Sequence, residues 1–302
     1  MLARLAAAGY RVRAWNRSSA ARLALQPVQA AHPGQVFAAC DPVDAVGGAD
    51  LIVTMLSDGP AVRAVLFGDG ENGMLADHLA ADSCLVDMSS IPPAMAREHA
   101  EWLEQRKVHA LDAPVSGGVV GARDGTLAIM AGGSPAALAK AITPLTALGR
   151  VTHVGPAGAG QLAKLANQVI VGVTIGAVAE ALLLAARGGA DARAVREAIR
   201  GGFAESRILD LHGARMLEED FAPGGAVHTQ LKDLETAVET ARSAGLDLPI
   251  TRLLRDLFAA ARGNGDGGLD HAALLRELGR RNHLPEHGLL VSPPANGPKS
   301  AA

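Results

Sequence analysis

The 302-residue chain contains few cysteines and few aromatic residues. Its two cysteines, Cys40 and Cys84, form neither a CxxC pair nor a Cys/His metal spacing, which excludes a disulfide framework and predicts no metal site. Aromatic residues make up 3% of the chain, too few for the stacking surfaces that bind single-stranded nucleic acid. We therefore expect a reduced, cytoplasmic protein without a metal centre.

A strong net charge and a long apolar run are also missing. The net charge of −3 provides no field that would recruit nucleic acid or an anionic membrane. No stretch of 18 uninterrupted apolar residues occurs, so we expect no membrane span. Residues 1–39 contain arginines but no acidic residue, as in a mitochondrial transit peptide, yet the strand pattern at residues 10–15 argues against one.

The first half of the chain alternates strand-like and helical patterns. The runs at residues 50–56 and 84–88 are apolar throughout their centres, which is typical of strands buried on both faces of a parallel sheet. Alternation with helices predicts an α/β, Rossmann-like doubly wound parallel sheet over residues 1–154. The expected strands are residues 10–15, 50–56, 84–88, 108–112, 126–131 and 151–154.

All patterns after residue 155 are helical, and the longest covers residues 160–187. They predict a separate all-helical domain for substrate binding and dimerisation over residues 155–283, with a further helix at residues 269–281. The Pro- and Gly-rich residues 284–302 are predicted to form a disordered tail. Because the long helix is apolar nearly all round, we expect a homodimer or homotetramer.

The chain begins inside a helix. Residues 1–8 have the pattern of the last turns of an apolar helix, so the first strand of a βαβ unit and its glycine-rich phosphate loop would precede Met1. A second pattern, Gly158-x-Gly160-x-x-Ala163, formally fits the dinucleotide fingerprint. No strand with an acidic end follows it, so we interpret it as a false match.

Two stretches carry candidate chemistry. Ser116-Gly117-Gly118 follows a strand and is expected to turn into another; its hydroxyl and amides could bind a carboxylate, although a plain glycine turn fits equally. Lys164 lies near the start of the long helix, with Asn167 and Gln168 on the same face. A helix N-terminus disfavours a protonated amine, so Lys164 could pass a proton to a carbonyl oxygen while hydride reaches the carbon. Lys232 alone would be assigned to a solvated helix face.

The motifs together resemble those of the β-hydroxyacid dehydrogenases, from residue 1 to about residue 281. These motifs are "AGYRVRAWNRS", "IVTMLSD", "VDMSS", "DAPVSGG", "GAGQLAKLANQ" and "LKDL". The resemblance implies an NAD(P)-dependent oxidoreductase that transfers hydride between its cofactor and a small β-hydroxy or 3-oxo acid. "KLANQVIV" and "PGGAVHTQLKDL" look more like the 2-hydroxy-3-oxopropionate (tartronate semialdehyde) reductase branch than the 3-hydroxyisobutyrate dehydrogenase branch.

The resemblance also implies a role for each site residue, with Lys164 as the general acid/base. Residues implied to hold the carboxylate substrate are Ser116, Gly117, Gly118, Asn167 and Gln168. Residues implied to line the cofactor are Asn16, Arg17, Ser18, Met55, Leu56, Ser57, Ser90 and Lys232. Because Arg17 suits a 2′-phosphate and no acidic residue stands beside it to bind a ribose 2′-hydroxyl, NADP is favoured over NAD.

Comparison with the family places roughly fifteen residues, including the first strand and glycine loop, ahead of Met1, as a mis-chosen translation start would explain. Two alternatives stay open: another dehydrogenase of the family, such as 3-hydroxyisobutyrate or sugar-acid dehydrogenase, and a non-catalytic truncated homologue. 6-Phosphogluconate dehydrogenases usually have His-Asn after the lysine, and imine reductases usually replace the lysine, so both are disfavoured.

Overall fold

The computed structural model describes residues 1–68 and 75–291, which form two compact units. Unit 1 comprises Met1–Lys164 and unit 2 comprises Leu165–Ala302. The predicted boundary after residue 154 lies at the end of the last strand of unit 1, whereas the division by contacts falls inside the helix that follows.

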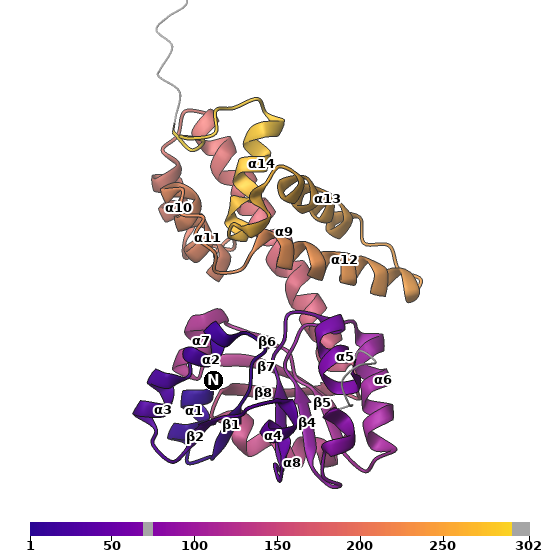
Figure 1. Cartoon of the computed structure of the whole chain (residues 1–302). Helices are drawn as coiled ribbons and strands as arrows, with labels where there is room; N and C mark the ends of the chain where they lie inside the picture. Colours follow the sequence, from indigo (N-terminus) through magenta and orange to yellow (C-terminus); the bar gives the residue numbers. More distant parts are fainter. Residues whose placement is uncertain (69–74, 292–302) are drawn as a thin grey trace, which may run out of the picture. The chain divides into compact units, whose positions relative to one another are not determined.

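Unit 1 alternates strands and helices along the chain (Figure 1). Its strands are β1 (Val12–Ala14), β2 (Val36–Ala38), β3 (Leu51–Thr54), β4 (Cys84–Asp87), β5 (His109–Asp112), β6 (Val115–Ser116), β7 (Leu127–Gly133) and β8 (Gly149–Gly155). Its helices are α1 (Leu2–Ala7), α2 (Ser19–Leu23), α3 (Gln26–Ala31), α4 (Pro42–Val46), α5 (Gly59–Phe67), η1 (Leu75–His78), α6 (Pro93–Glu104), α7 (Gly118–Asp124) and α8 (Pro135–Thr146).

The larger sheet of unit 1 has the strand order β3-β4-β5-β7-β6, and β8 also pairs with β7. Strands β3, β4 and β5 are parallel, in agreement with the expected doubly wound sheet. Strand β7 runs antiparallel to β5, and β8 then runs parallel to β7. The sheet is therefore mixed at one end, a feature that the strand pattern alone does not indicate.

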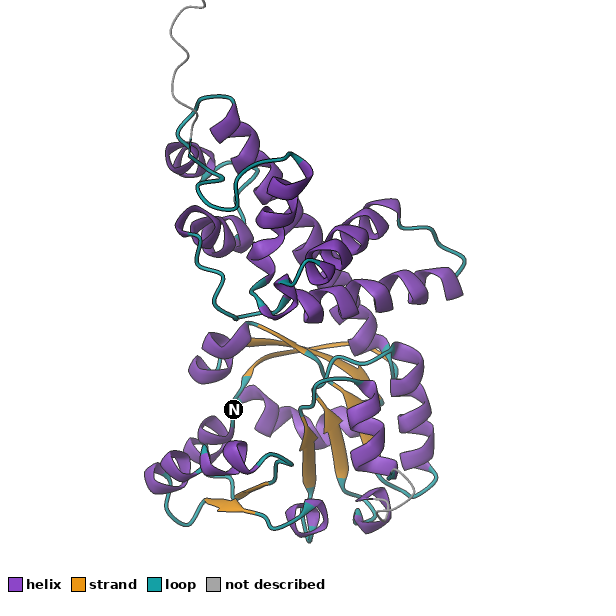
Figure 2. Cartoon of the chain, turned by 45° about the horizontal axis from the view of Figure 1, so that its top comes forward, coloured by secondary structure: helices purple, strands orange, loops and turns teal. Residues whose placement is uncertain are grey.

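Strand β4 of this sheet is buried on both faces. Cys84 and Val86 of β4 belong to one core cluster with residues of α8, whereas Leu85 belongs to another with residues of α5 and α6. Figure 2 shows these helices in purple around the orange strands. Successive residues of a strand point to opposite faces, so a strand covered on both sides must be apolar throughout, as its sequence is.

Strands β1 and β2 pair with each other in parallel and form a separate two-stranded sheet. Among the described residues, no strand is hydrogen-bonded to both this pair and β3. The sequence analysis expects a preceding strand in this part of the unit, and that expectation stays a prediction.

Unit 2 is all-helical in its described part (Figure 1). Helix α9 begins in unit 1 and continues as the central helix of unit 2. Helix α10 packs on α11, and α12 packs on α13. The helices are α9 (Ala159–Arg187), α10 (Ala192–Ile199), α11 (Arg207–Glu218), α12 (Val227–Ser243), α13 (Pro249–Gly263), η2 (Asp266–Gly268), η3 (His271–Ala273) and α14 (Leu274–Arg281).

Helix α9 is long and apolar enough to cross a membrane by length and composition alone. Its Ile175, Ala179 and Leu182 are instead fully buried in the core of unit 2, as in the central helix of a soluble domain.

Local structure differs from the sequence expectations in five places. Strands β2 and β6 were not expected, and residues 118–124 form helix α7 where a direct entry into a strand was expected. The helix expected at residues 269–281 is a 3₁₀ turn, η3, followed by the short α14. Leu289, which the sequence analysis assigns to the tail, is 3% exposed and packs in the core of unit 2; residues 292–302 lie outside the described residues.

Candidate active site

The side chain of Lys164 lies against strand β6. Its Nζ donates a hydrogen bond to the carbonyl oxygen of Val115 at 2.9 Å. Ser116 is the next residue of the same strand, so the structure brings the first and second candidate stretches together within unit 1. Lys164 is half-buried near the start of α9, and the helix holds its backbone in place.

The N-terminal turn of α9 is anchored by a buried carboxylate. Asp112, the last residue of β5, accepts hydrogen bonds from the amide of Gly158 at 2.7 Å and the amide of Gln161 at 2.8 Å. A Cβ on Gly160 would collide with the main-chain oxygens of Asp112 and Met130. The glycines of this stretch are therefore explained by close packing of the helix on strand ends, in agreement with the false-match interpretation.

Asp112 is only 5% exposed, and this burial raises the pKa of its carboxyl from 3.8 to about 6. The hydrogen bonds from Gly158 and Gln161 favour the charged form and limit the rise. The carboxyl that fixes the start of the lysine-bearing helix thus titrates close to neutral pH.

Ser116-Gly117-Gly118 makes a turn that only glycine fits well. Gly117 has φ +133° and Gly118 has φ +62°, the region that L side chains rarely adopt. A Cβ on Gly117 would also lie 3.2 Å from Cδ2 of Leu127. Helix α7 begins at Gly118, so the amides of this turn stand at a helix start; binding of a carboxylate there stays a prediction.

Gln161 connects α9 to the loop after β4. Its Nε2 donates to the carbonyl oxygen of Ser89 at 2.8 Å, and its Oε1 accepts from the amide of Ile91 at 3.1 Å. The hydroxyl of Ser89 in turn accepts from the amide of Leu56 at 2.9 Å. Lys164 is one turn beyond Gln161 on the same helix, so this network fixes the lysine relative to the ends of β3 and β4.

A second buried carboxyl, Asp87, closes the end of β4. Its Oδ1 accepts from the hydroxyl of Thr54 at 2.8 Å and from the amide of Ser89 at 3.0 Å. Its Oδ2 is buried without a hydrogen-bond partner among the described residues. Burial raises the pKa of this carboxyl, while the contacts with Ser89 and Thr54 oppose the rise. Sequence reasoning missed Asp87, Asp112 and Gln161; the signal was a polar residue ending or flanking an apolar run.

The cofactor-lining residues predicted in unit 1 lie where the parallel strands β1, β3 and β4 end. Asn16, Arg17 and Ser18 follow β1 and are exposed; Oδ1 of Asn16 accepts from the amide of Ser18 at 2.9 Å. After β3, Met55 and Ser57 are exposed and Leu56 is half-buried, and Ser90 is half-buried after β4.

Carboxyl ends of parallel strands are where doubly wound folds bind dinucleotides. The exposed Arg17 guanidinium also has the donor chemistry that a phosphate group requires. The residues present in this part of unit 1 therefore fit a nicotinamide dinucleotide.

In unit 2, Gln168 links α9 to α12. Its Nε2 donates to Oδ2 of Asp233 at 2.6 Å, and Oδ1 of Asp233 lies 3.2 Å from Nζ of Lys232. Nδ2 of Asn167 donates to Oε1 of Gln168 at 2.8 Å. Nε2 of Gln230 donates to the carbonyl oxygen of Gln168 at 3.0 Å. Asn167, Gln168 and Lys232 are thus brought together, and their substrate and cofactor roles stay predictions.

Family models match most of the chain. The model described as the NAD binding domain of 6-phosphogluconate dehydrogenase matches residues 1–155. The model described as NAD-binding of NADP-dependent 3-hydroxyisobutyrate dehydrogenase matches residues 158–278.

Individual proteins are similar over comparable lengths. The chain is 45% identical to 2-hydroxy-3-oxopropionate reductase of Escherichia coli over 230 residues, which cover 76% of this chain and 78% of that protein. It is 33% identical to 3-hydroxyisobutyrate dehydrogenase of Pseudomonas aeruginosa, covering 86% and 87%. The crystal structure of 3-hydroxyisobutyrate dehydrogenase from Salmonella typhimurium aligns with a TM-score of 0.81 at 29% identity, covering 91% and 94%.

Proposed function

This chain belongs to the β-hydroxyacid dehydrogenase family and is an NAD(P)-dependent oxidoreductase, and from that premise we propose that it reduces 2-hydroxy-3-oxopropionate with NADPH. The observation that supports this most is the hydrogen bond from Lys164 to Val115, which holds an ammonium group beside Ser116 and its glycine turn. The 45% identity to the Escherichia coli reductase supports the choice of substrate.

In the proposed mechanism the cofactor supplies hydride when it is bound. Nζ of Lys164 donates a proton to the aldehyde oxygen of the substrate, and in the reverse direction it accepts the proton from the alcohol. The Val115 carbonyl oxygen holds the lysine ammonium in place. The Ser116 hydroxyl and the amides of the glycine turn orient the substrate carboxylate, which fixes the carbonyl carbon for hydride.

Arg17 is proposed to contact the 2′-phosphate of NADP, with Asn16 and Ser18 beside it. Met55, Leu56, Ser57 and Ser90 are proposed to line the rest of the cofactor in unit 1. In unit 2, Lys232 is proposed to contact the cofactor, and Asn167 and Gln168 the substrate. The side-chain amide of Gln168 donates both to Asp233 and to Oε1 of Gln230, which supports a positioned rather than mobile amide.

A comparison of substrates and cofactors tests this function. We expect NADPH oxidation with 2-hydroxy-3-oxopropionate to have a kcat/KM at least about tenfold above that with NADH, a difference of about 1.4 kcal/mol. Oxidation of 3-hydroxyisobutyrate is the control, because the other branch of the family would prefer it. If 3-hydroxyisobutyrate is the better substrate, the family assignment stands and the proposed substrate is wrong.

We also propose that the protein is a cytoplasmic homodimer or homotetramer. Several large apolar side chains of unit 2 are exposed, including Ile170 and Leu184 on α9 and Leu211 on α11. Two free cysteines, of which Cys40 is exposed, agree with a reducing compartment. Static light scattering is expected to give a mass of two or four times 30.8 kDa. A monomeric mass at micromolar concentration would contradict this proposal.

A further inference from the structure

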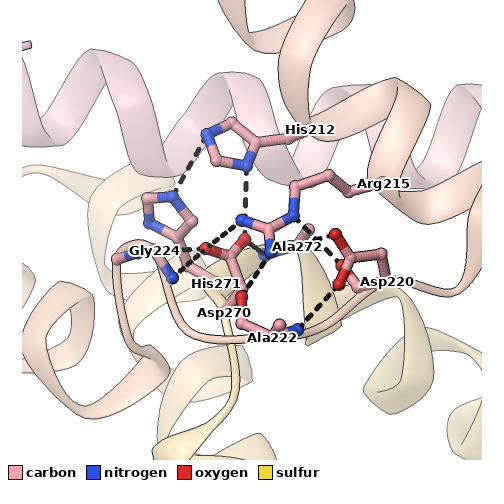
Figure 3. Close-up of polar contacts among 9 residues, drawn as sticks. His212, Arg215, Asp220, Ala222, Gly224, Asp270, His271 and Ala272 are labelled. Atoms are coloured by element: carbon pink, nitrogen blue, oxygen red, sulfur yellow. Dashed lines mark hydrogen bonds and ion pairs between the residues drawn. The ribbon is translucent and has the colours of Figure 1, made fainter. Parts of the chain in front are cut away.

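A cluster of titratable side chains lies in unit 2 on helix α11 and turn η3 (Figure 3). Nε2 of His271 and Nε2 of His212 are 3.2 Å apart, and the two rings meet edge-on with centroids 4.4 Å apart. Nδ1 of His212 lies 3.3 Å from Oδ1 of Asp270. None of the roles proposed for Lys164, the glycine turn or the cofactor-lining residues uses this cluster.

Asp270 is fully buried and its oxygens are fixed by several donors. Oδ2 accepts from Nη1 of Arg215 at 2.9 Å and from the amides of Gly224 and Gly225 at 3.1 and 3.0 Å. Oδ1 accepts from the amide of Ala272 at 3.0 Å. The Arg215 guanidinium and three backbone amides thus surround the carboxyl with hydrogen-bond donors, which favour its charged form.

Backbone hydrogen bonds fix the main chain at both Asp270 and His271. Its amide donates to the carbonyl oxygen of Gly225 at 2.7 Å, and the amide of Asp270 donates to the carbonyl oxygen of Phe221 at 3.0 Å. Asp270 and Ala226 form an antiparallel bridge between these two segments. The main chain that carries the His271 ring is thus fixed before any ligand arrives.

The Asp270 carboxylate lies 3.3 Å from Nδ1 of His212 without a hydrogen bond between the two. Its negative charge favours the tautomer of His212 with the proton on Nδ1, which leaves the Nε2 lone pair toward Nε2 of His271. Two imidazole nitrogens that bind one tetrahedral ion at 2.0–2.1 Å lie about 3.3 Å from each other, and here they are 3.2 Å apart. A carboxylate behind a ligating histidine is the usual support of such sites.

We propose that His212 and His271 bind a divalent transition-metal ion, Zn²⁺ or an ion of similar ligand preference, through their Nε2 atoms. Water completes the coordination, and His271 carries its single proton on Nδ1 when Nε2 binds the ion, so that both ligands are neutral imidazoles. Imidazole ligands select such ions over Mg²⁺ and Ca²⁺, which prefer oxygen. Arg215 forms ion pairs with Asp220, at 3.3 Å, and with Asp270. These three side chains together carry a net charge of −1, which favours the binding of a cation.

The sequence predicted no metal site because the two histidines are 59 residues apart and share no motif. Only the packing of η3 against α11 brings them together. A bound ion would tie these two elements and stabilise unit 2 without taking part in hydride transfer.

Zinc titration of the untagged full chain, stripped with a chelator, tests the proposal. Calorimetry is expected to show one Zn²⁺ per chain at this site, and His212→Gln and His271→Gln are each expected to lower the affinity at least about tenfold. His228→Gln is the matched control, because this exposed histidine contacts the carbonyl oxygen of Gly267 and lies outside the His212–His271 cluster. Its zinc binding is expected to equal that of the wild type.

Thermal unfolding gives a second readout that does not depend on the two variants folding well. Zn²⁺ is expected to raise the Tm of the wild type and of His228→Gln, whereas Mg²⁺ leaves both unchanged. Equal zinc affinity in His212→Gln, His271→Gln and the wild type would overturn the proposal, as would a wild-type Tm that zinc does not raise.

Discussion

Replacement of Lys164 by alanine is expected to lower kcat by about 10²–10⁴-fold while leaving NADPH affinity nearly unchanged. The proposed reaction needs a proton donor at the aldehyde oxygen, and the Lys164 ammonium is held for this task by the Val115 carbonyl oxygen. Alanine removes that donor without touching the proposed cofactor-lining residues. Stopped-flow measurement of NADPH oxidation, with a fluorescence titration of NADPH binding, separates the two effects.

Lys140→Ala is the matched control for this experiment. Lys140 lies in α8 and forms an ion pair with Asp82 at 2.8 Å on the surface of the same unit. Its removal is expected to leave kcat within about twofold of the wild-type value, because surface ion pairs contribute little. If Lys164→Ala retained full activity, the proposed acid/base role would be wrong, although the family membership would still hold.

The sequence predicted the parts of the fold that follow from long apolar runs. Strands β3 and β4 are apolar without alternation because core clusters cover both of their faces, and helix α9 is apolar nearly all round over its 29 residues. Strand β6 has only two residues, which is too short for any period to be visible. Strand β2 is also short, and β7 changes direction relative to β5, which only tertiary pairing decides.

The sequence motifs indicated candidate residues but not the contacts that support them. Lys164 and Ser116-Gly117-Gly118 stand in motifs, and in the structure Lys164 contacts Val115 of strand β6, which ends at Ser116. Gln161 and Asp112 are 49 residues apart in the sequence, and their contact depends on how α9 packs on the end of β5. The same holds for Gln168 and Asp233, which are 65 residues apart. A single sequence has no signal for pairs of this kind.

The contact between Asp112 and the start of α9 affects the stability of unit 1. A buried carboxylate is destabilising unless donors surround it, and Asp112 has two amide donors at the start of α9. The same carboxylate replaces the partners that the first turn of the helix lacks. Removing it would leave two buried N–H groups unpaired one turn before Lys164.

Asp112→Ala is accordingly expected to lower the free energy of unfolding of unit 1 by about 2–4 kcal/mol at pH 7, since each buried unpaired donor costs about 1–3 kcal/mol. Urea unfolding followed by tryptophan fluorescence measures this, because both tryptophans, Trp15 and Trp102, lie in unit 1. Asp41→Ala is the control: Asp41 caps the exposed α4, and its loss is expected to cost about 1 kcal/mol.

The decrease in the free energy of unfolding caused by Asp112→Ala should also depend on pH, and its direction follows from the pKa of Asp112. The folded-state pKa of Asp112, about 6, is above its ordinary value of 3.8, so the stability linked to its protonation is fully present below pH 3.8 and disappears as the pH rises through 6. The wild type therefore gains stability from this group at pH 5 relative to pH 7, and the variant does not.

The difference in free energy of unfolding between the two proteins should be larger at pH 5 than at pH 7 by about 1 kcal/mol. His99, whose pKa burial lowers, is present in both proteins and cancels in the difference, whereas the charge of Asp87 helps to raise the pKa of Asp112 and is part of the effect measured. An equal difference at both pH values would show that the Asp112 carboxyl is ionised throughout, and that its two amide donors outweigh its burial.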